Sequence, residues 1–394
     1  MPEKKKAYIP IFYIFIFLYL FFATECLSDP SQQTIFYDNK DKTALEIARL
    51  VADKYITSSP QTYSPNFPQD KVFHPWIYPT GVTLWSLCQL YDITQDKRYL
   101  DFVSHSFDYY LDNNKIVYKI DMNKGGMMGH ALLELNNRRP DPRYKELVRN
   151  ISHYYEHEQS RLPDGSICYK RKPELRRTWI DSLFVWCPIQ AKSAKLFNQS
   201  QRYKDVMQQF FNFTTRLQDP SVKLFYQGWG WGKNRTTHSP GFWCRGNGWV
   251  IMAMTESLSA IPLNELGREK LLGIYRDFAQ AILKQQAPSG RWHQLMTRPD
   301  SYQETSGTAM FIYSFATGFN KGWLTEKYKD AALKAFAGLK DKIDQDGNIY
   351  DTCVSCGSQD TLKAYYQREK RTNEVHAIGP VILAACAVST LENK

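Results

Sequence analysis

Helix-length apolar patterns follow one another along most of this chain, with loops between them. After residue 40 apolar residues recur at three- and four-residue spacing, while the strict alternation typical of strands is sparse. Four loops end in a basic residue and a tyrosine just before a helical pattern: Arg98-Tyr99, Arg143-Tyr144, Arg202-Tyr203 and Lys327-Tyr328. Adjacent copies lie about 45 to 60 residues apart, as in repeated helical hairpins. The sequence therefore predicts an all-α protein built from helical hairpins.

Such hairpins can stack in an open solenoid or close into a ring, and the loops favour closure. Residues 160–179 and 218–241 are too long for the turns of a solenoid. Both segments carry aromatic and charged residues, which a closed ring would gather around one cavity. No linker rich in proline and glycine divides the chain. We therefore predict a single domain over residues 29–394, folded as an (α/α)6 barrel, which is a toroid of six helical hairpins.

The first 28 residues differ in character from the rest. Lys4, Lys5 and Lys6 precede a nearly unbroken apolar stretch over residues 9–23, and small or polar residues follow. This order is typical of a secretory signal peptide, so we predict a cleaved signal over residues 1–28 and a secreted chain that is free of the membrane. An uncleaved membrane anchor is the alternative, because the apolar stretch is long and no clean Ala-x-Ala site follows it.

Export would decide whether asparagines are glycosylated and whether cysteines form disulfides. Four Asn-x-Ser/Thr sequences would be glycosylation sites in a eukaryotic secretory route: Asn150, Asn198, Asn212 and Asn234. The chain has eight cysteines. Cys353 and Cys356 form a Cys-x-x-Cys pair, for which we expect a local disulfide or two free thiols. No second such pair and no close histidine pair completes a zinc site, so the sequence predicts no metal.

The formal charge of +10 indicates the class of ligand. An excess of positive charge favours polyanions. The basic residues are dispersed in ones and twos, and no recognition motif accompanies them, so we do not expect nucleic acid as a partner. An acidic oligosaccharide suits an exported protein better. We also expect a monomer.

The segment Phe242–Trp249 combines two tryptophans and a fixed cation. Trp243 and Trp249 enclose Arg245 and a Gly-Asn-Gly turn, whose glycines let the backbone come close. An indole offers a flat surface to the C–H face of a pyranose ring, and a guanidinium can hold a carboxylate through two parallel hydrogen bonds. The cluster therefore suits a sugar acid. In the alternative interpretation both tryptophans are buried core at a helix start, and Arg245 is a surface charge.

Two carboxylates occupy matching places at the start of predicted helices. Asp181 lies in the first turn of an apolar helix, and Asp121 precedes a helix that starts near Met127. Apolar and aromatic neighbours raise the pKa of a carboxyl group and make it a usable proton donor near neutral pH. Two carboxylates at equivalent hairpin ends would face one cavity, as glycoside hydrolysis commonly requires. Taken singly, each fits a helix cap equally well.

A third cluster lies around Glu304. This residue precedes hydroxyl-bearing side chains and a strongly apolar helix. Hydroxyl groups at this place indicate first a helix cap. In the alternative interpretation, Glu304 binds sugar hydroxyls. Nucleophilic serine or cysteine chemistry finds little support, because the sequence has no Gly-x-Ser-x-Gly elbow, phosphate-binding glycine loop or metal-spaced histidine pair.

Three of these segments together resemble glycoside hydrolase families 88 and 105, and family 105, the unsaturated rhamnogalacturonyl hydrolases, more closely. Residues 243–249 resemble the Trp-Ala-Arg-Gly-Asn-Gly-Trp signature of that family. Residues 179–184 resemble the segment around its catalytic aspartate, and residues 304–310 resemble its Glu-x-Ser-x-Ser-Ala-Met segment. The order along the chain agrees, and the resemblance extends from about Gly81 to the C-terminus. It implies an (α/α)6 barrel, as the repeat does.

The resemblance also implies a reaction that needs no cofactor. Enzymes of this type hydrate the C4=C5 double bond of the unsaturated uronic acid that a polysaccharide lyase leaves at a non-reducing end. The product opens to a 5-keto sugar acid and releases the neighbouring sugar. By this resemblance Asp181 protonates C4 and then takes a proton from the water that adds at C5, while Asp121 orients the substrate. Trp243, Arg245 and Trp249 would line the subsite for the unsaturated ring.

The expected substrate is the unsaturated galacturonyl end of a rhamnogalacturonan oligosaccharide left by a pectin lyase. Two departures from the family pattern bear on this choice. Gln227 replaces a frequent histidine in a His-Gly-Trp sequence, and Tyr169-Lys170 stand in for a basic pair ahead of the catalytic aspartate. We expect Gln227, Tyr169 and Lys170 to contact the substrate. Unsaturated glucuronyl ends of glycosaminoglycan or algal oligosaccharides are one alternative. A non-catalytic carbohydrate-binding protein is another, favoured by Gln227.

Overall fold

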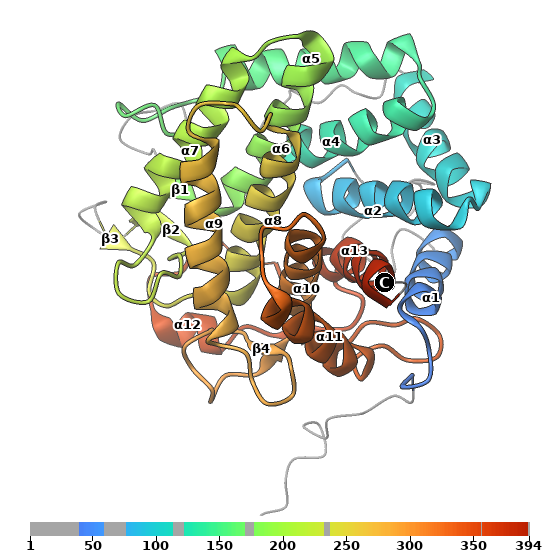
Figure 1. The fold of residues 1–394 in the computed structure, drawn as a ribbon, viewed down its shortest axis with the longest axis vertical. Coiled ribbons are helices and arrows are strands. Elements are labelled where there is room, and N and C mark those ends of the chain that lie inside the picture. The colour runs from blue at the N-terminus through green and yellow to red at the C-terminus, as the bar shows by residue number, and fades with distance from the viewer. Residues whose placement is uncertain are drawn as a thin grey trace, which may run out of the picture. The chain divides into compact units, whose positions relative to one another are not determined.

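The computed structural model describes residues 39–58, 76–112, 122–169, 177–231, 237–355 and 357–392. All of them fall within one compact unit, Phe36–Lys394. In these ranges the chain forms thirteen helices and seven strands of two to four residues (Figure 1). The predicted all-α class is therefore confirmed.

Six helices form an inner ring. They are α2 (Tyr78–Thr94), α4 (Met122–Arg138), α6 (Asp181–Phe197), α8 (Cys244–Ala260), α10 (Thr305–Asn320) and α13 (Val375–Glu392). Consecutive members pack side by side in this order, and α13 packs against α2. This last contact closes the ring, which confirms the predicted barrel.

Six further helices surround the ring (Figure 1). Five of them pack on the inner helix that precedes them in the chain: α3 (Lys97–Asp112), α5 (Pro142–His157), α7 (Gln201–Leu217), α9 (Arg268–Leu283) and α11 (Glu326–Lys340). The sixth, α1 (Ala44–Thr57), packs on α13. The last of the six predicted hairpins is thus assembled from the first and last helices that the structure describes.

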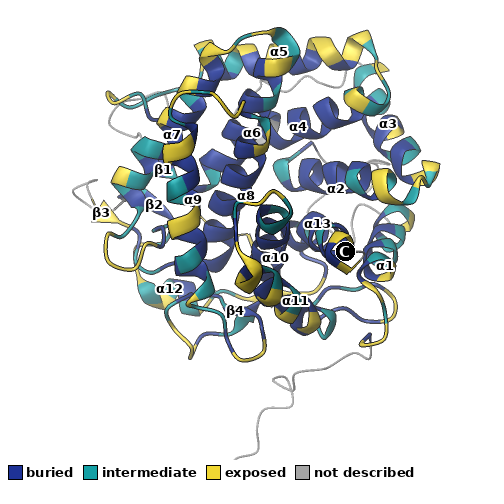
Figure 2. Ribbon diagram, in the orientation of Figure 1, coloured by how far each residue is buried: buried dark blue, intermediate teal, exposed yellow. Residues whose placement is uncertain are grey.

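Burial separates the two rings (Figure 2). Every residue of α8 from Cys244 to Leu258 is buried, whereas α7 buries one stripe at three- and four-residue spacing. Among the described residues α13 is long and apolar enough to cross a membrane, but 83% of its apolar window is buried inside the fold. Its composition is explained by its place in the inner ring.

Glycines set the distance between inner helices. A Cβ atom on Gly81 of α2 would lie 2.4 Å from the backbone carbon of Met127 in α4, and one on Gly379 of α13 would lie 2.7 Å from the backbone carbon of Val82 in α2. Real Cβ contacts are not this short, so these helices can approach one another only because glycine has no side chain.

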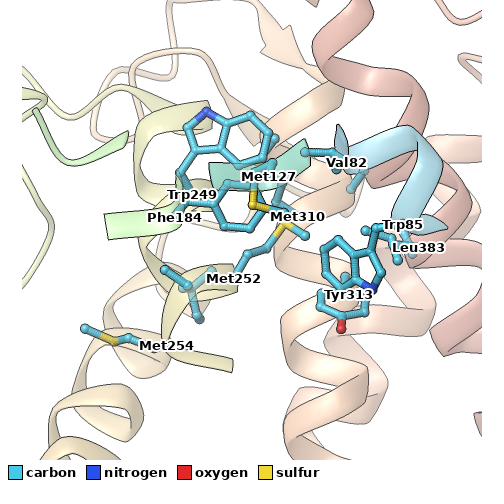
Figure 3. Close-up of a cluster of buried hydrophobic side chains, with 14 of the residues drawn as sticks. Val82, Trp85, Met127, Phe184, Trp249, Met252, Met254, Met310, Tyr313 and Leu383 are labelled. Atoms are coloured by element: carbon cyan, nitrogen blue, oxygen red, sulfur yellow. The ribbon is translucent and has the colours of Figure 1, made fainter. Parts of the chain in front are cut away.

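The centre of the ring is filled by apolar side chains (Figure 3). Every inner helix contributes to this filling: Val82 and Trp85 (α2), Met127 (α4), Phe184 (α6), Trp249 and Met252 (α8), Met310 and Tyr313 (α10) and Leu383 (α13). The interior is a packed core and not a pore through the ring.

A buried group of charges lies in the C-terminal halves of the inner helices. Lys192 of α6 donates hydrogen bonds to Glu134 of α4 at 2.6 Å and to Glu256 of α8 at 2.7 Å. Tyr313 of α10 donates to Glu256. The group ties four inner helices together at the end of the ring away from their N-termini.

Small antiparallel sheets occupy the long segments that lead into the inner helices. The sheet of β1 (Thr178–Trp179), β2 (Gly228–Trp231) and β3 (Thr237–His238) precedes α6 and α8. The pair β4 (Trp292–His293) and β5 (Gln303–Glu304) precedes α10. The pair β6 (Thr352–Cys353) and β7 (Lys370–Arg371), with the short α12 (Leu362–Tyr366), precedes α13.

Candidate active site

The N-termini of the inner helices meet at one end of the ring, called here the N-terminal mouth. Short loops connect five of the inner helices to the outer helices that follow them, and the start of α13 contacts the start of α2 through His376 and Tyr78, so all six inner helices run in the same direction. Residues from the starts of α2, α6, α8, α10 and α13 interact there, as described below. Helix N-termini carry free N–H groups and partial positive charge. The mouth is therefore suited to an anionic ligand.

Asp181 is the first residue of α6 at this mouth. The backbone N–H of Ile180 donates to the carbonyl of Gln227 at 3.0 Å, and Trp179 pairs with Gly228, so the β1–β2 ladder fixes the start of the helix. Asp181 is partly exposed, but its Oδ2 atom is buried and has no hydrogen-bond partner among the described residues. Burial raises the pKa of Asp181 to about 6, and the charge of Arg245 opposes this rise. A carboxyl group in this state can hold and release a proton.

Arg245 is fully buried in the first turn of α8. Its Nη1 donates to the Cys353 carbonyl at 2.5 Å and to Ser306 Oγ at 3.3 Å, and its Nη2 donates to the Val354 carbonyl at 2.9 Å. The guanidinium also lies over the ring of Trp243, 4.6 Å from its centroid. Arg245 is thus neither an open carboxylate clamp nor a surface charge, because its Nη atoms hold the β6 segment in place.

Trp243 and Trp249 are also buried, with 2% and 0% exposure. Trp249 stacks on Phe184 at 4.5 Å and lies edge-on to Tyr78, within the core that fills the ring (Figure 3). The expectation of two open indole faces for a sugar is therefore wrong for this structure, because protein side chains already occupy those faces. The alternative with both tryptophans in the core describes their packing correctly.

Unpartnered donors nevertheless gather at the mouth. Among the described residues, the indole N–H groups of Trp243 and Trp249 and the Nε–H of Arg245 are buried without a hydrogen-bond partner. Buried polar groups are almost always paired in folded proteins. Within the described ranges Trp85 and Trp186 also bury unpaired indole N–H groups, but the charge of Arg245 acts on Asp181, so at the mouth an unpaired donor and an unpaired carboxyl oxygen belong to the starts of two adjacent inner helices.

The Gly-Asn-Gly sequence lies inside α8 and does not form the separate turn that the sequence predicted, and it has a structural role. Asn247 accepts a hydrogen bond from Phe225 N–H at 2.8 Å and donates to the Phe225 and Trp243 carbonyls at 3.0 Å each. A Cβ atom on Gly248 would lie 2.6 Å from the sulfur of Met310. The motif therefore joins α8 to α10 and to the segment before β2, with the glycine allowing the close approach.

Glu304 is the N-cap of α10. Its carboxylate accepts hydrogen bonds from Ser306 N–H at 3.1 Å, Gly307 N–H at 2.7 Å, Ser306 Oγ at 2.7 Å and Cys353 N–H at 3.1 Å. It is also fully buried, 3.8 Å from Arg245. Glu304 therefore belongs to the framework that joins α10 to β6, and its contact with sugar hydroxyls stays a prediction.

Other predicted residues border Asp181 or lie outside the described ranges. Gln227 is buried, and its Oε1 accepts a hydrogen bond from Tyr365 at 2.6 Å. The partly exposed ring of Tyr169 lies 4.5 Å from that of Trp179, two residues before Asp181. The predictions for Asp121 and Lys170 fall outside the described residues.

The predicted cysteine pair is described in part. Cys353 is buried and has a free thiol. Cys356 lies outside the described residues, as do the predicted signal sequence and the predicted glycosylation site at Asn234.

The pattern that defines Glycosyl Hydrolase Family 88 matches residues 47–392. The chain belongs to this family. It is similar to the unsaturated rhamnogalacturonyl hydrolase YesR of Bacillus subtilis (strain 168), with 25% identity over 299 residues, which cover 74% of this chain and 83% of that protein. It is also 28% identical over 231 residues to an unsaturated 3S-rhamnoglycuronyl hydrolase of Formosa agariphila, covering 56% of this chain and 61% of that protein.

Solved structures agree with the family 88 assignment. A family 105 glycoside hydrolase of C. acetobutylicum ATCC 824 superposes with a TM-score of 0.77 at 26% identity, covering 87% of this chain and 99% of that one. An unsaturated glucuronyl hydrolase of Bacillus sp. GL1 shares the fold, with a TM-score of 0.66 at 16% identity and coverage of 89% and 96%. The resemblance read from the sequence is confirmed, and the chain is a glycoside hydrolase.

The structure of this family 88 chain also shows residues at the mouth that sequence reasoning missed. Tyr78 starts α2, and its phenol contacts His376 and responds to the charges of Asp181 and Arg245. Trp179 is the partly exposed aromatic residue next to Ile180 and Asp181. Each had its own signal in the sequence: Trp179 lies two residues before the candidate acid, and Tyr78 starts its inner helix as Asp181 does.

Proposed function

We propose that this chain hydrates the C4=C5 double bond of an unsaturated uronic acid at the non-reducing end of an oligosaccharide. The observation that carries the proposal is Asp181, a single carboxyl group with a pKa of about 6 and an unpartnered oxygen at the N-terminal mouth. Family membership and the similarity to YesR support the same reaction class.

The proposed chemistry uses Asp181 twice. Its carboxyl proton passes to C4, and the electron pair of the double bond forms the new C4–H bond. Positive charge then develops at C5 and is shared with the ring oxygen. A water molecule adds at C5 and gives a proton to the Asp181 carboxylate, which restores the acid. The hemiketal opens to the 5-keto acid and releases the neighbouring sugar, with one water consumed overall.

The rest of the mouth is proposed to hold the uronate. Its carboxylate and hydroxyl oxygens would accept from the unpaired N–H groups of Trp243, Trp249 and Arg245, and the helix N-termini favour its negative charge. In this arrangement the tryptophans bind through their ring edges, since their faces are packed. Tyr169 and Trp179 are the partly exposed aromatic residues beside Asp181 for the sugar ring.

For the substrate we propose the unsaturated galacturonyl end of a rhamnogalacturonan oligosaccharide, encountered outside the cell after a pectin lyase. The similarity to YesR supports this choice, and the basic residues of the chain favour an acidic ligand. The Formosa agariphila relative supports an unsaturated rhamnoglycuronyl end as the second candidate.

The test is loss of the ultraviolet absorbance of the conjugated double bond, measured on both substrates and on an unsaturated chondroitin disaccharide. We expect wild type to consume the rhamnogalacturonan disaccharide fastest, and Asp181→Asn to be slower by roughly 10²- to 10⁴-fold. Asp330→Asn, at an exposed position of α11, is the matched control and should keep full activity. Full activity of Asp181→Asn would remove the assigned acid. Binding of all three sugars without turnover would favour a carbohydrate-binding protein.

A further inference from the structure

Three side chains form a hydrogen-bonded line at the N-terminal mouth, where α13 packs against α2 and closes the ring. Glu374 Oε2 lies 2.7 Å from His376 Nδ1, and His376 Nε2 lies 2.6 Å from the Tyr78 hydroxyl. Glu374 and His376 are at the start of α13 and are buried, with 7% and 4% exposure. Tyr78 is partly exposed at the start of α2. The reaction proposed above uses none of the three.

The hydrogen-bonded line ends at the Tyr78 hydroxyl, on which the charge of Asp181, the proposed acid, acts. Burial raises the pKa of Tyr78, the negative charges of Asp181 and Glu374 raise it further, and the charge of Arg245 opposes the rise. Tyr169 is the other titratable group that affects it. The phenol therefore stays neutral, and it lies within reach of the charge on Asp181. Its ring is fixed edge-on to Trp249, with centroids 5.9 Å apart.

Glu374 determines which nitrogen of His376 carries a proton. Burial raises the pKa of Glu374, but the charge of His376, hydrogen bonds from His376 and the charge of Arg245 outweigh burial and hold this pKa at about 2, so the carboxylate is ionised at ordinary pH. A carboxylate can only accept, so Nδ1 of His376 must donate to it. The same carboxylate oxygen accepts from the backbone N–H of His376 at 2.9 Å, which fixes the ring further.

The direction of the second hydrogen bond follows from the first. In a neutral imidazole that is protonated on Nδ1, the Nε2 atom has no hydrogen and can only accept. The Tyr78 hydroxyl must then donate its proton to His376. Its oxygen keeps free lone pairs and presents an acceptor, not a donor, to the mouth.

We propose that Glu374 and His376 are positioning residues that hold Tyr78 as a fixed hydrogen-bond acceptor beside Asp181. The group that Tyr78 accepts from is an O–H, either of the water that reacts at C5 or of a sugar hydroxyl. This inference rests on the proposed function for its catalytic consequence, whereas the proton arrangement itself rests on the two hydrogen bonds, an ionised Glu374 and a neutral imidazole of His376.

The first experiment measures the proton arrangement without any substrate. Nitrogen-15 spectra of histidine-labelled wild type, with the His376 signals assigned by their loss in His376→Gln, should show a proton on Nδ1 and a bare Nε2 near neutral pH. Tyr78→Phe should shift the Nε2 signal, because it removes the donor. A proton on Nε2 in wild type would overturn the proposal. A correct arrangement in a protein that is inactive on every unsaturated sugar would refute the proposed function only.

The second experiment is a double-mutant cycle on kcat/KM. Tyr78→Phe and His376→Gln should each lower it roughly 10- to 100-fold, and the double variant should be no slower than the worse single variant. Glu374→Gln should slow the wild type but not the Tyr78→Phe background. Tyr275→Phe, which removes a buried hydroxyl bonded to the Ser314 carbonyl away from the mouth, is the control and should change nothing. Strictly multiplicative effects of Tyr78→Phe and His376→Gln would overturn the coupling.

The same variants identify the O–H group that donates a hydrogen bond to Tyr78. A lower kcat with an unchanged KM in Tyr78→Phe assigns its acceptor oxygen to the reacting water. A raised KM assigns it to a sugar hydroxyl. Unchanged kcat and KM would show that the phenol takes no part in the reaction.

Discussion

At the scale of single residues, Asp181 is a carboxyl group placed where it is less stable as an anion than in water. Burial at the start of α6 raises its pKa from 3.8 to about 6. The proposed first step requires the protonated form. We therefore expect kcat/KM to fall as pH rises through about 6, and to fall by about tenfold for each further pH unit. A pH–rate profile on the unsaturated disaccharide tests this, and a rate that is flat between about pH 5 and 8 would contradict it.

The same shift has a consequence for stability. Because the folded chain binds this proton more tightly than the unfolded chain, the contribution is fully present below about pH 4 and is lost as pH rises through about 6. Asp181→Asn removes the buried anion. It should raise the free energy of unfolding by about 1–3 kcal/mol at neutral pH and change it little near pH 4. Denaturant unfolding at both pH values measures this, with Asp330→Asn as the reference.

Arg245 illustrates a buried charge whose partners come from far along the chain. Its removal would leave the carbonyls of Cys353 and Val354 without their donors and Glu304 without its nearest cation. We expect Arg245→Ala to lower the free energy of unfolding by about 3–5 kcal/mol. Arg298→Ala, at an exposed position, should have little effect. Equal stability of the two variants would show that the buried network contributes nothing.

At the scale of helices, the inner ring depends on close backbone contacts. Gly81→Ala would place a methyl group against the backbone of Met127, so we expect a loss of about 1–3 kcal/mol as the ring is forced apart. Gly273→Ala on the outer helix α9 is the matched control, because its Cβ meets no atom within 4 Å. That change should be neutral or stabilise by up to about 1 kcal/mol. Thermal unfolding of the pair measures the difference.

Helical hairpins and their closure could be predicted from the sequence because both depend on local patterns. Apolar spacing shows each helix, and Tyr99 and Tyr144 mark the starts of outer helices where the structure buries them. The short strands could not be predicted, since two-residue ladders such as β4 and β5 form only when the helices around them bring their ends together.

The candidate site was predictable in part, and the failures have one cause. Asp181 could be named as a candidate and placed at a helix start because its own segment carries the signal. The burial of Arg245 could not, because it depends on residues 353 and 354, more than 100 positions away. The line from Tyr78 to His376 joins residues separated by 298 positions, and only ring closure brings them together.

At the scale of the whole molecule, the closure of the ring by α1 and α13 predicts how truncation acts. Deletion of residues 1–28 should leave a folded protein, in agreement with the predicted signal peptide. Deletion of residues 1–58 also removes α1 and exposes the face of α13 that it covers. We expect this second form to aggregate or to lose cooperative unfolding, as measured by solubility and calorimetry. A stable, soluble chain without α1 would show that five complete hairpins suffice.

The filled centre of the ring also determines how substrate enters and how products leave. Trp85, Met252 and Tyr313 are buried in the apolar cluster at the centre of the ring (Figure 3), so we expect no open route from the mouth to the charged group around Lys192. A polysaccharide chain cannot pass through a filled ring, which agrees with the proposed action on the end of an oligosaccharide. Products must then leave through the same N-terminal mouth by which the next substrate enters. We therefore expect the released sugar acid to compete directly with incoming substrate.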